Sequence, residues 1–274
     1  MRGGITMIGK ICALVLSVLM LSGLVTAPAS AGPGTEITVS AAISLKNVFE
    51  EAGKVYEAKN RGVKVVFNFG ASGDLMQQVE GGAPVDVFVS AAQKDMDELS
   101  GKGLIIPGSR ADIATNSVAL VIPTNSNSRI KSVDGLTSGE IKRIAVGNFR
   151  TTPAGRYSED VFNYYRLLPA IYDKLIFAGN VRQVLDYVAR GEVDAGIVYS
   201  TDAQMRAKEV RVVATAPPAS HKPIVYPIAV VKGTGNEAAA KGFVAFILSS
   251  EGKKILEKYG FKVRMQVRSF VVAQ

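Results

Sequence analysis

The chain has 274 residues, of which 47% are hydrophobic and 20% are charged, with a formal net charge of +8 and a single cysteine. This composition excludes a disordered chain, and the length allows one large hydrophobic core or two smaller ones. Lys and Arg are scattered singly rather than gathered into a basic stripe between aromatic residues. We therefore expect no nucleic-acid partner.

The N-terminus has the three parts of an export signal. Arg2 and Lys10 precede an apolar run at 11–25, and small residues follow up to Ala31. A membrane anchor needs roughly 20 apolar residues, and this run is shorter. The pattern predicts a signal peptide at 1–31 that is removed on export. Cys12 lies inside it, too early to be a lipid-attachment site, so we expect a free periplasmic protein without disulfides or thiolate ligands.

Short β-rich runs alternate with amphipathic helical stretches along the rest of the chain. A first unit has expected strands at 36–39, 63–69 and 86–90, and helices at 44–60 and 73–80. A second has strands at 117–123, 143–147 and 195–199, and helices at 154–167 and 181–190. A last strand at 226–231 precedes helices at 236–248 and 251–259. This alternation is typical of α/β folds with mostly parallel sheets.

The late helices need a sheet to cover, and the first unit offers one. The predicted domains are therefore lobe 1 at 32–116 and 227–274, and lobe 2 at 117–226.

Four predicted turns lead into helices, and a strand ends at a tyrosine. Ser44 and Ser72 each stand where a helix begins, which favours N-caps. Pro153 in the turn 152–155 occupies an expected first helical position, and Asn180 opens the helix at 181–190. Tyr199 closes the strand at 195–199, at the end where open α/β sheets bind ligands.

Each feature alone is ordinary, since most such serines are simple caps and most such tyrosines belong to the core. Together, several helix N-termini and three hydroxyls make an anion site. No Lys or Arg occupies a predicted contact position, although Arg156 lies nearby. Hydrogen bonds rather than salt bridges are expected to hold the anion.

Several motifs resemble those of the periplasmic molybdate-binding proteins, in the same order and with the same spacing. They are AAISL at 41–45, FGASGDL at 69–75, GAPVDVF at 82–88, PAGRY at 153–157 and GIVYSTDA at 196–203. The resemblance covers most of the exported chain but not the tail at 262–274. It implies a type II periplasmic binding protein fold, with two lobes joined by a two-segment hinge.

The resemblance also implies the ligand and its contacts. Molybdate or tungstate would be bound by the side chains of Ser44 and Ser72, the backbone N–H groups of Ala154 and Val181, and the Tyr199 hydroxyl. Molybdenum would be present only within the oxyanion, and no cofactor is implied. The expected protein is a monomeric, non-enzymatic receptor that serves the membrane permease of an ABC transporter. Ile43 and the serine-poor turn at 70–73 depart mildly from the family pattern, without removing a proposed donor.

Three other interpretations compete with this one. The turn at 233–238 imitates a dinucleotide-binding fingerprint, but no further βαβ unit follows it. A serine hydrolase needs a general base, yet His221 is the only histidine and stands in a proline-rich loop. Another oxyanion, chiefly sulfate, stays open. Phosphate is less favoured, because its proton at neutral pH calls for an acceptor that the proposed contacts do not offer.

Overall fold

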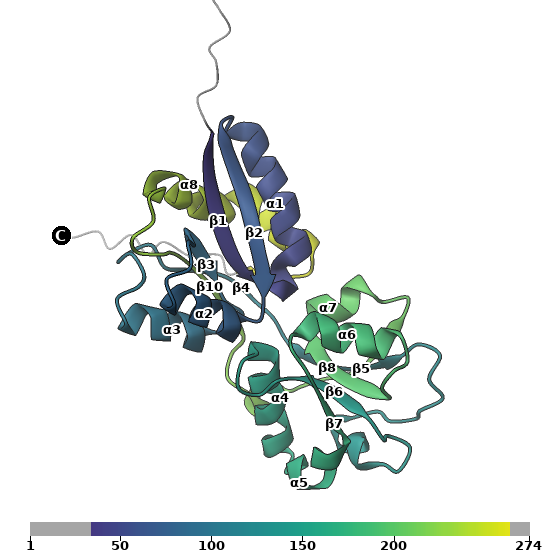
Figure 1. Cartoon of the computed structure of the whole chain (residues 1–274). Helices are drawn as coiled ribbons and strands as arrows, with labels where there is room; N and C mark the ends of the chain where they lie inside the picture. Colours follow the sequence, from purple (N-terminus) through teal and green to yellow (C-terminus); the bar gives the residue numbers. More distant parts are fainter. Residues whose placement is uncertain (1–33, 264–274) are drawn as a thin grey trace, which may run out of the picture. The chain divides into compact units, whose positions relative to one another are not determined.

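A computed structural model describes residues 34–263, and its strands form two five-stranded sheets (Figure 1). The first sheet has the strand order β2-β1-β3-β10-β4. Its strands are β1 (Thr35–Ala42), β2 (Val63–Gly70), β3 (Val87–Val89), β4 (Ala111–Thr115) and β10 (Val225–Val230). The second sheet has the order β7-β6-β8-β5-β9. Its strands are β5 (Val118–Pro123), β6 (Ile144–Gly147), β7 (Leu175–Ala178), β8 (Ala195–Tyr199) and β9 (Val210–Thr215).

One strand in each sheet runs against the other four. In the first sheet β1, β2 and β3 are mutually parallel, whereas β10 is antiparallel to both of its neighbours. In the second sheet β5 has the same position between β8 and β9. The predicted two-lobed α/β fold with mostly parallel sheets is therefore confirmed. The antiparallel strands are the ones that the chain enters directly after crossing between the sheets.

Helices cover both sheets. Those of the first are α1 (Lys46–Lys59), α2 (Ser72–Glu80), α3 (Gln93–Gly101), α8 (Glu237–Leu248) and α9 (Ser250–Lys258). Those of the second are α4 (Pro153–Tyr164), α5 (Leu168–Ile171), α6 (Val181–Ala189) and α7 (Ser200–Met205). As expected, the late helix α8 packs on β10 and β1, and α9 packs on α1. Phe243 of α8 meets Tyr56 of α1 edge to face, with ring centroids 5.4 Å apart.

Sequence patterns missed the helices α3, α5 and α7. They also missed three strands, β4, β7 and β9, and each of these strands lies at the edge of its sheet. An edge strand buries only part of its surface, so polar residues can interrupt its apolar pattern. In β9, for example, only Val210 is fully buried and Arg211 is exposed. Among the predicted strands, β5 and β8 are nearly continuous apolar runs and are buried along their whole length.

The chain crosses between the sheets twice. It leaves the first sheet after Thr115 and enters the second at Val118, then returns between Thr215 and Val225. Tyr226, assigned to lobe 2 from the sequence, lies in β10 of the first sheet. The predicted signal peptide at 1–31 and most of the tail at 262–274 lie outside the described residues. Among the helices between residues 34 and 263, none is both long and apolar enough to cross a membrane.

Candidate anion-binding site

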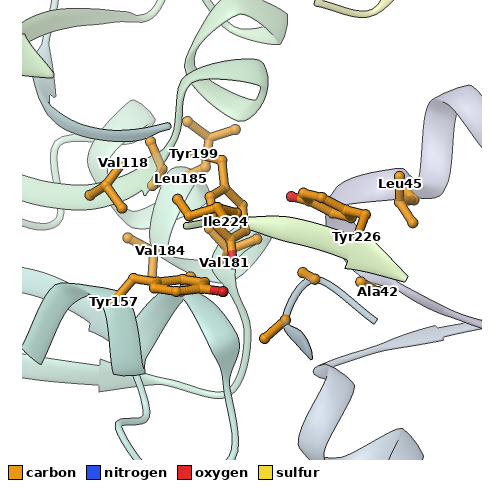
Figure 2. Packing of buried hydrophobic residues seen from close by; sticks show 14 of the residues in the cluster. Ala42, Leu45, Val118, Tyr157, Val181, Val184, Leu185, Tyr199, Ile224 and Tyr226 are labelled. Atoms are coloured by element: carbon orange, nitrogen blue, oxygen red, sulfur yellow. The ribbon is translucent and has the colours of Figure 1, made fainter. Parts of the chain in front are cut away.

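A small cavity of about 220 Å³ of atom-free space, partly open to solvent, is lined from both sheets. All five residues that the sequence proposed as ligand contacts line it: Ser44, Ser72, Ala154, Val181 and Tyr199. None of them is more than 4% exposed. Figure 2 shows Val181 and Tyr199 on one side and Ala42 and Tyr226 on the other. The structure thus brings together residues that are more than 150 positions apart in the chain.

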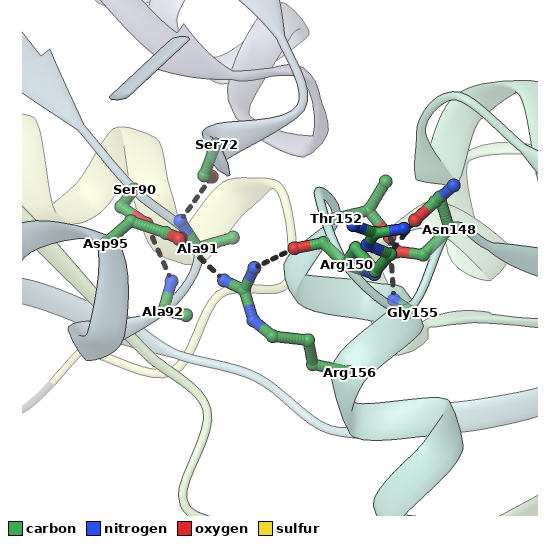
Figure 3. A network of polar contacts seen from close by, with 10 residues as sticks. All are labelled: Ser72, Ser90, Ala91, Ala92, Asp95, Asn148, Arg150, Thr152, Gly155 and Arg156. Carbon is green, nitrogen blue, oxygen red and sulfur yellow. Dashed lines mark hydrogen bonds and ion pairs between the residues drawn. The ribbon is translucent and has the colours of Figure 1, made fainter. Parts of the chain in front are cut away.

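The two serines do not cap helices, which corrects the prediction. Ser44 lies within the 3₁₀ turn Ile43–Leu45 that precedes α1, and neither the turn nor the helix has a side-chain cap. Ser72 is the first residue of α2, whose N-cap is Ala71. The Ser72 Oγ instead accepts a hydrogen bond of 3.0 Å from the backbone N–H of Ala91 (Figure 3). The sequence placed both serines correctly at helix starts and misassigned what their hydroxyls do.

The two helix starts in the second sheet match their predictions. Thr152 caps α4, its Oγ1 accepting from the Gly155 N–H at 2.9 Å, and Pro153 follows at the first helical position. Because proline has no N–H, the first free amide of α4 belongs to Ala154. Asn180 caps α6 in the same way, with its Oδ1 3.0 Å from the Gln183 N–H.

Each capping side chain accepts from the third residue of its helix and leaves free the earliest amide, which belongs to a residue that lines the cavity. The amides of Ala154 and Val181 have no acceptor among residues 34–263. Such amides at a helix N-terminus carry positive potential and suit an anion.

Tyr199 ends β8, and its side chain is buried against Tyr157 and Tyr226. Its hydroxyl is fully buried and has no hydrogen-bond partner within the described part of the chain. Burial raises the pKa of this hydroxyl well above its ordinary value, so the group stays protonated and remains a donor.

No charged side chain lines the cavity among the described residues, but two arginines stand just behind it. Arg156 of α4 pairs with Asp95 of α3, through contacts of 2.7 and 2.8 Å from one guanidinium nitrogen to both carboxylate oxygens. Arg182 of α6 has its Nε 2.6 Å from Oδ1 of the fully buried Asp202, although the N–H direction is not that of a hydrogen bond. Each positive charge is therefore matched by a buried carboxylate, and neutral donors remain to face the cavity.

Sequence reasoning missed the polar groups that support these donors. Arg182 also donates to Ser44 O and to Asn47 Oδ1, at 3.3 and 3.1 Å, and so contacts the first sheet's side of the cavity from α6. Asn116 and Tyr226 lie behind Ser44 and were not identified either. No local sequence signal distinguishes these residues, because their partners are remote in the chain.

The competing chemistries find no matching geometry in residues 34–263. His221 packs its ring on Tyr157 and does not line the cavity that contains Ser72. No group of three or more His, Cys, Asp or Glu side chains is arranged to hold a metal ion in this part of the chain. Thr234, in the turn that imitates a dinucleotide motif, bonds to Asp86 instead, and only α8 and α9 follow it among the described helices and strands.

Comparisons with known proteins agree with this architecture. The chain is 37% identical over 235 residues to the molybdate-binding protein ModA of Haemophilus influenzae, covering 84% of this chain and 91% of that one. It is 38% identical over 225 residues to a putative ABC transporter substrate-binding lipoprotein of Bacillus subtilis, covering 82% and 85%.

Solved structures show the same fold. The substrate-binding domain of a putative molybdenum ABC transporter from Clostridium difficile is 37% identical, with a TM-score of 0.66 and coverage of 85% of this chain and 100% of that one. The periplasmic molybdate-binding protein of Azotobacter vinelandii, at 24% identity, has a TM-score of 0.74 over 84% of this chain and 100% of that one. Residues 37–262 match the family described as bacterial extracellular solute-binding protein. The chain therefore belongs to this family of ModA-type proteins, which carry solutes outside the cytoplasm and are not an enzyme family.

Proposed function

We propose that this protein captures molybdate or tungstate in the cavity between the two sheets and delivers it to the membrane permease of an ABC importer. Relatives at 34% to 37% identity are named as molybdate-binding proteins, which supports the choice of ligand. We further propose that the two sheets with their helices act as lobes that close over the oxyanion. Closure of this kind couples ligand affinity to a hinge motion.

The Tyr199 hydroxyl is the observation that carries this proposal. It is fully buried at the wall of the cavity and has no protein acceptor in residues 34–263. A buried donor without a partner costs about 1 to 3 kcal/mol. An anion oxygen in the cavity would remove that cost, and the free amides of Ala154 and Val181 would serve the same ligand.

The donor character of the site favours a fully deprotonated anion. Ser72 already accepts a hydrogen bond from Ala91 N–H, so its own hydrogen remains for the cavity. No carboxylate lines the cavity within the described residues, so a ligand proton would find no acidic acceptor. Molybdate, tungstate and sulfate carry no proton at neutral pH, whereas phosphate does. The site therefore disfavours phosphate.

Calorimetry with the four oxyanions tests the proposal. The exported protein should bind molybdate or tungstate at least about a hundredfold more tightly than sulfate, a difference of about 2.7 kcal/mol. Equal affinity for sulfate would contradict this preference, and the protein would then be assigned as a receptor for a smaller oxyanion. Tightest binding of phosphate would contradict the donor-only assignment.

Salt dependence separates neutral donors from long-range attraction. Hydrogen bonds inside a closed cavity are little screened, whereas the attraction of a basic surface falls as ionic strength rises. We expect the affinity to change less than about threefold between low and high salt. A steep loss of affinity with salt would instead assign binding to surface charge.

The proposed partners and location follow from the same assignment. We propose periplasmic export with cleavage after Ala31, and the intact mass of the protein recovered from the periplasm checks it. We also propose a monomer without nucleic-acid affinity and without enzymatic turnover. Light scattering, a DNA-binding assay and ester or phosphoester substrates test these three points in turn.

A further inference from the structure

A chain of side-chain contacts leads from the crossing between the sheets to the cavity. Asn116 stands between β4 and β5, in the first crossing segment, and Tyr226 lies in β10, just after the second. The Asn116 Nδ2 is 3.2 Å from the Tyr226 hydroxyl, which is itself 3.2 Å from Ser44 Oγ. Ser44 lines the cavity, and Tyr226 does not. Figure 2 shows Tyr226 between Leu45 and Tyr199, with its hydroxyl directed away from Leu45.

The backbone fixes the orientation of the Asn116 amide. Its Oδ1 accepts a hydrogen bond of 2.9 Å from the N–H of Ser117, so the other side-chain atom must be the nitrogen. The backbone N–H of Asn116 also donates to Ile224 O at 3.2 Å, which joins the two crossing segments. The amide nitrogen has two hydrogens and cannot accept. One hydrogen goes to Thr201 Oγ1 at 2.9 Å, and the other to the Tyr226 oxygen.

The remaining directions follow one after another. Because the Tyr226 oxygen accepts from Asn116, its own hydrogen is left for Ser44 Oγ. Tyr226 is fully buried, and burial raises the pKa of its hydroxyl, so that hydrogen stays in place. Ser44 Oγ then accepts from Tyr226 and can only donate its single hydrogen elsewhere. The direction left to that hydrogen is the cavity.

We propose that Asn116 and Tyr226 are positioning residues that hold the Ser44 hydroxyl as a donor toward the bound oxyanion. This inference rests on the proposed function and extends it. The polarity of the whole chain of hydrogen bonds is set by one amide in the crossing segment. Specificity for deprotonated oxyanions is therefore determined partly by residues that never touch the ligand.

Reversing the direction of these hydrogen bonds at Asn116 gives the sharpest test. In Asn116→Asp the carboxylate can only accept, so the Tyr226 and Thr201 hydroxyls can both turn and donate to it. The Tyr226 oxygen would then accept from Ser44, whose lone pairs would face the anion. We expect molybdate affinity to fall at least about a hundredfold. Tyr226→Phe, which removes the orienting group without reversing it, should lower the affinity about three- to tenfold.

The added charge of Asn116→Asp repels an anion by itself, so its effect must be measured in two backgrounds. With the Tyr226 hydroxyl present the substitution reverses Ser44, whereas in Tyr226→Phe only the charge acts. We expect the loss of affinity caused by Asn116→Asp to be at least about fivefold smaller in the Tyr226→Phe background than in the wild type. The loss should be reduced to the same extent in the Ser44→Ala background. Tyr56→Phe removes another buried tyrosine hydroxyl, which within residues 34–263 bonds only to Ala239 O, and this variant should bind normally.

Calorimetry with molybdate on these variants decides the matter, with thermal unfolding of each ligand-free variant as a check on folding. A smaller effect of Asn116→Asp on affinity in both the Tyr226→Phe and the Ser44→Ala backgrounds supports the proposed chain of hydrogen bonds. Equal effects in all backgrounds would overturn the proposed chain of hydrogen bonds. The proposed function would still be upheld by binding in the wild type and by the effect of Ser44→Ala. Failure of the wild-type protein to bind any oxyanion would overturn both.

Discussion

Arg156 on α4 holds Asp95 on α3 with one guanidinium nitrogen shared between the two carboxylate oxygens, at 2.7 and 2.8 Å (Figure 3). The helices belong to different sheets, so the pair spans the two sides of the cavity. Asp95 is only 2% exposed and also accepts from Ser90 Oγ at 2.9 Å. Burial raises the pKa of Asp95, while Arg156 and Ser90 act in the opposite direction.

Removing Arg156 should lower molybdate affinity more than it lowers the stability of the fold. In Arg156→Gln a buried carboxylate loses its partner, which is costly only while the site is closed. A ligand-free protein can open and hydrate Asp95, so we expect molybdate affinity to fall about tenfold with little change in the unfolding temperature. Calorimetry and thermal unfolding provide the two readouts.

The double variant Arg156→Gln with Asp95→Asn is the matched control. It removes both charges together, so no carboxylate is left uncompensated, and part of the affinity should return. If the single variant binds normally, the ion pair does not contribute to closure. A large loss of stability in the ligand-free single variant would show that the pair stays closed without ligand.

Asp202 should make the stability of the protein depend on pH. Burial raises the pKa of this fully buried carboxyl to about 6, and Arg182 acts in the opposite direction. A group whose pKa is raised on folding favours the folded state at low pH, and this contribution is lost as pH rises through the folded pKa. Stability should therefore fall between about pH 4 and pH 6, by about 3 kcal/mol if this group acted alone.

Asp202→Asn should flatten that slope, because the side chain no longer titrates. Denaturant unfolding at several pH values measures it, and the exposed Asp173→Asn serves as the control for loss of one acidic residue. Burial also raises the pKa of Asp95, so part of the dependence of stability on pH should persist. An unchanged slope in Asp202→Asn would assign the whole effect to other groups.

How much the sequence could predict depended on how local each interaction is. Pro153 and Asn180 were assigned correctly to helix starts and Tyr199 to a strand end, because neighbouring residues determine these features. The partner of Ser72 is Ala91, 19 residues away, and that contact made the predicted N-cap wrong. Tyr226 reaches Ser44 over 182 positions, and no periodicity or motif encodes such a pairing.

The fold followed the same rule. Central strands such as β5 and β8 were found because burial on both faces leaves a continuous apolar run. Of the edge strands, β2 was predicted, whereas β4, β7 and β9 were missed. In β9 the polar Arg211 interrupts the apolar pattern. The last strand was assigned to the correct lobe, but the predicted boundary at 226/227 cut off the first two residues of β10, Val225 and Tyr226.

Gly73 of α2 and Thr151, which precedes α4, approach each other closely. The Gly73 N–H donates to Thr151 O at 3.0 Å, and a Cβ at this position would lie 2.4 Å from that oxygen. Gly73→Ala should therefore obstruct closure and lower molybdate affinity about tenfold or more. Within α2, alanine is the better helix former by about 1 kcal/mol, so the ligand-free protein should be at least as stable as the wild type.

Gly101→Ala is the matched control for that substitution. Gly101 ends α3, and an added Cβ there meets no atom within 4 Å. It should leave the affinity unchanged. If Gly73→Ala binds normally in the same calorimetric titration, then closure does not require the contact with Thr151.

Ser72 and Tyr199 should separate binding from stability, because their hydroxyls differ in what they do without ligand. Ser72 Oγ accepts from Ala91 N–H, so Ser72→Ala leaves a buried amide without a partner and should destabilise the ligand-free protein by about 1 to 2 kcal/mol. The Tyr199 hydroxyl has no partner in the described residues, so Tyr199→Phe should leave stability unchanged or slightly raised. Both variants should lose about ten- to a hundredfold in molybdate affinity, since each removes a donor to a charged ligand.

Chemical unfolding without ligand and calorimetry with it measure the two effects on the same samples. A stability loss in Tyr199→Phe equal to that in Ser72→Ala would mean that the Tyr199 hydroxyl has a structural partner, and normal affinity in either variant would remove that residue from the site.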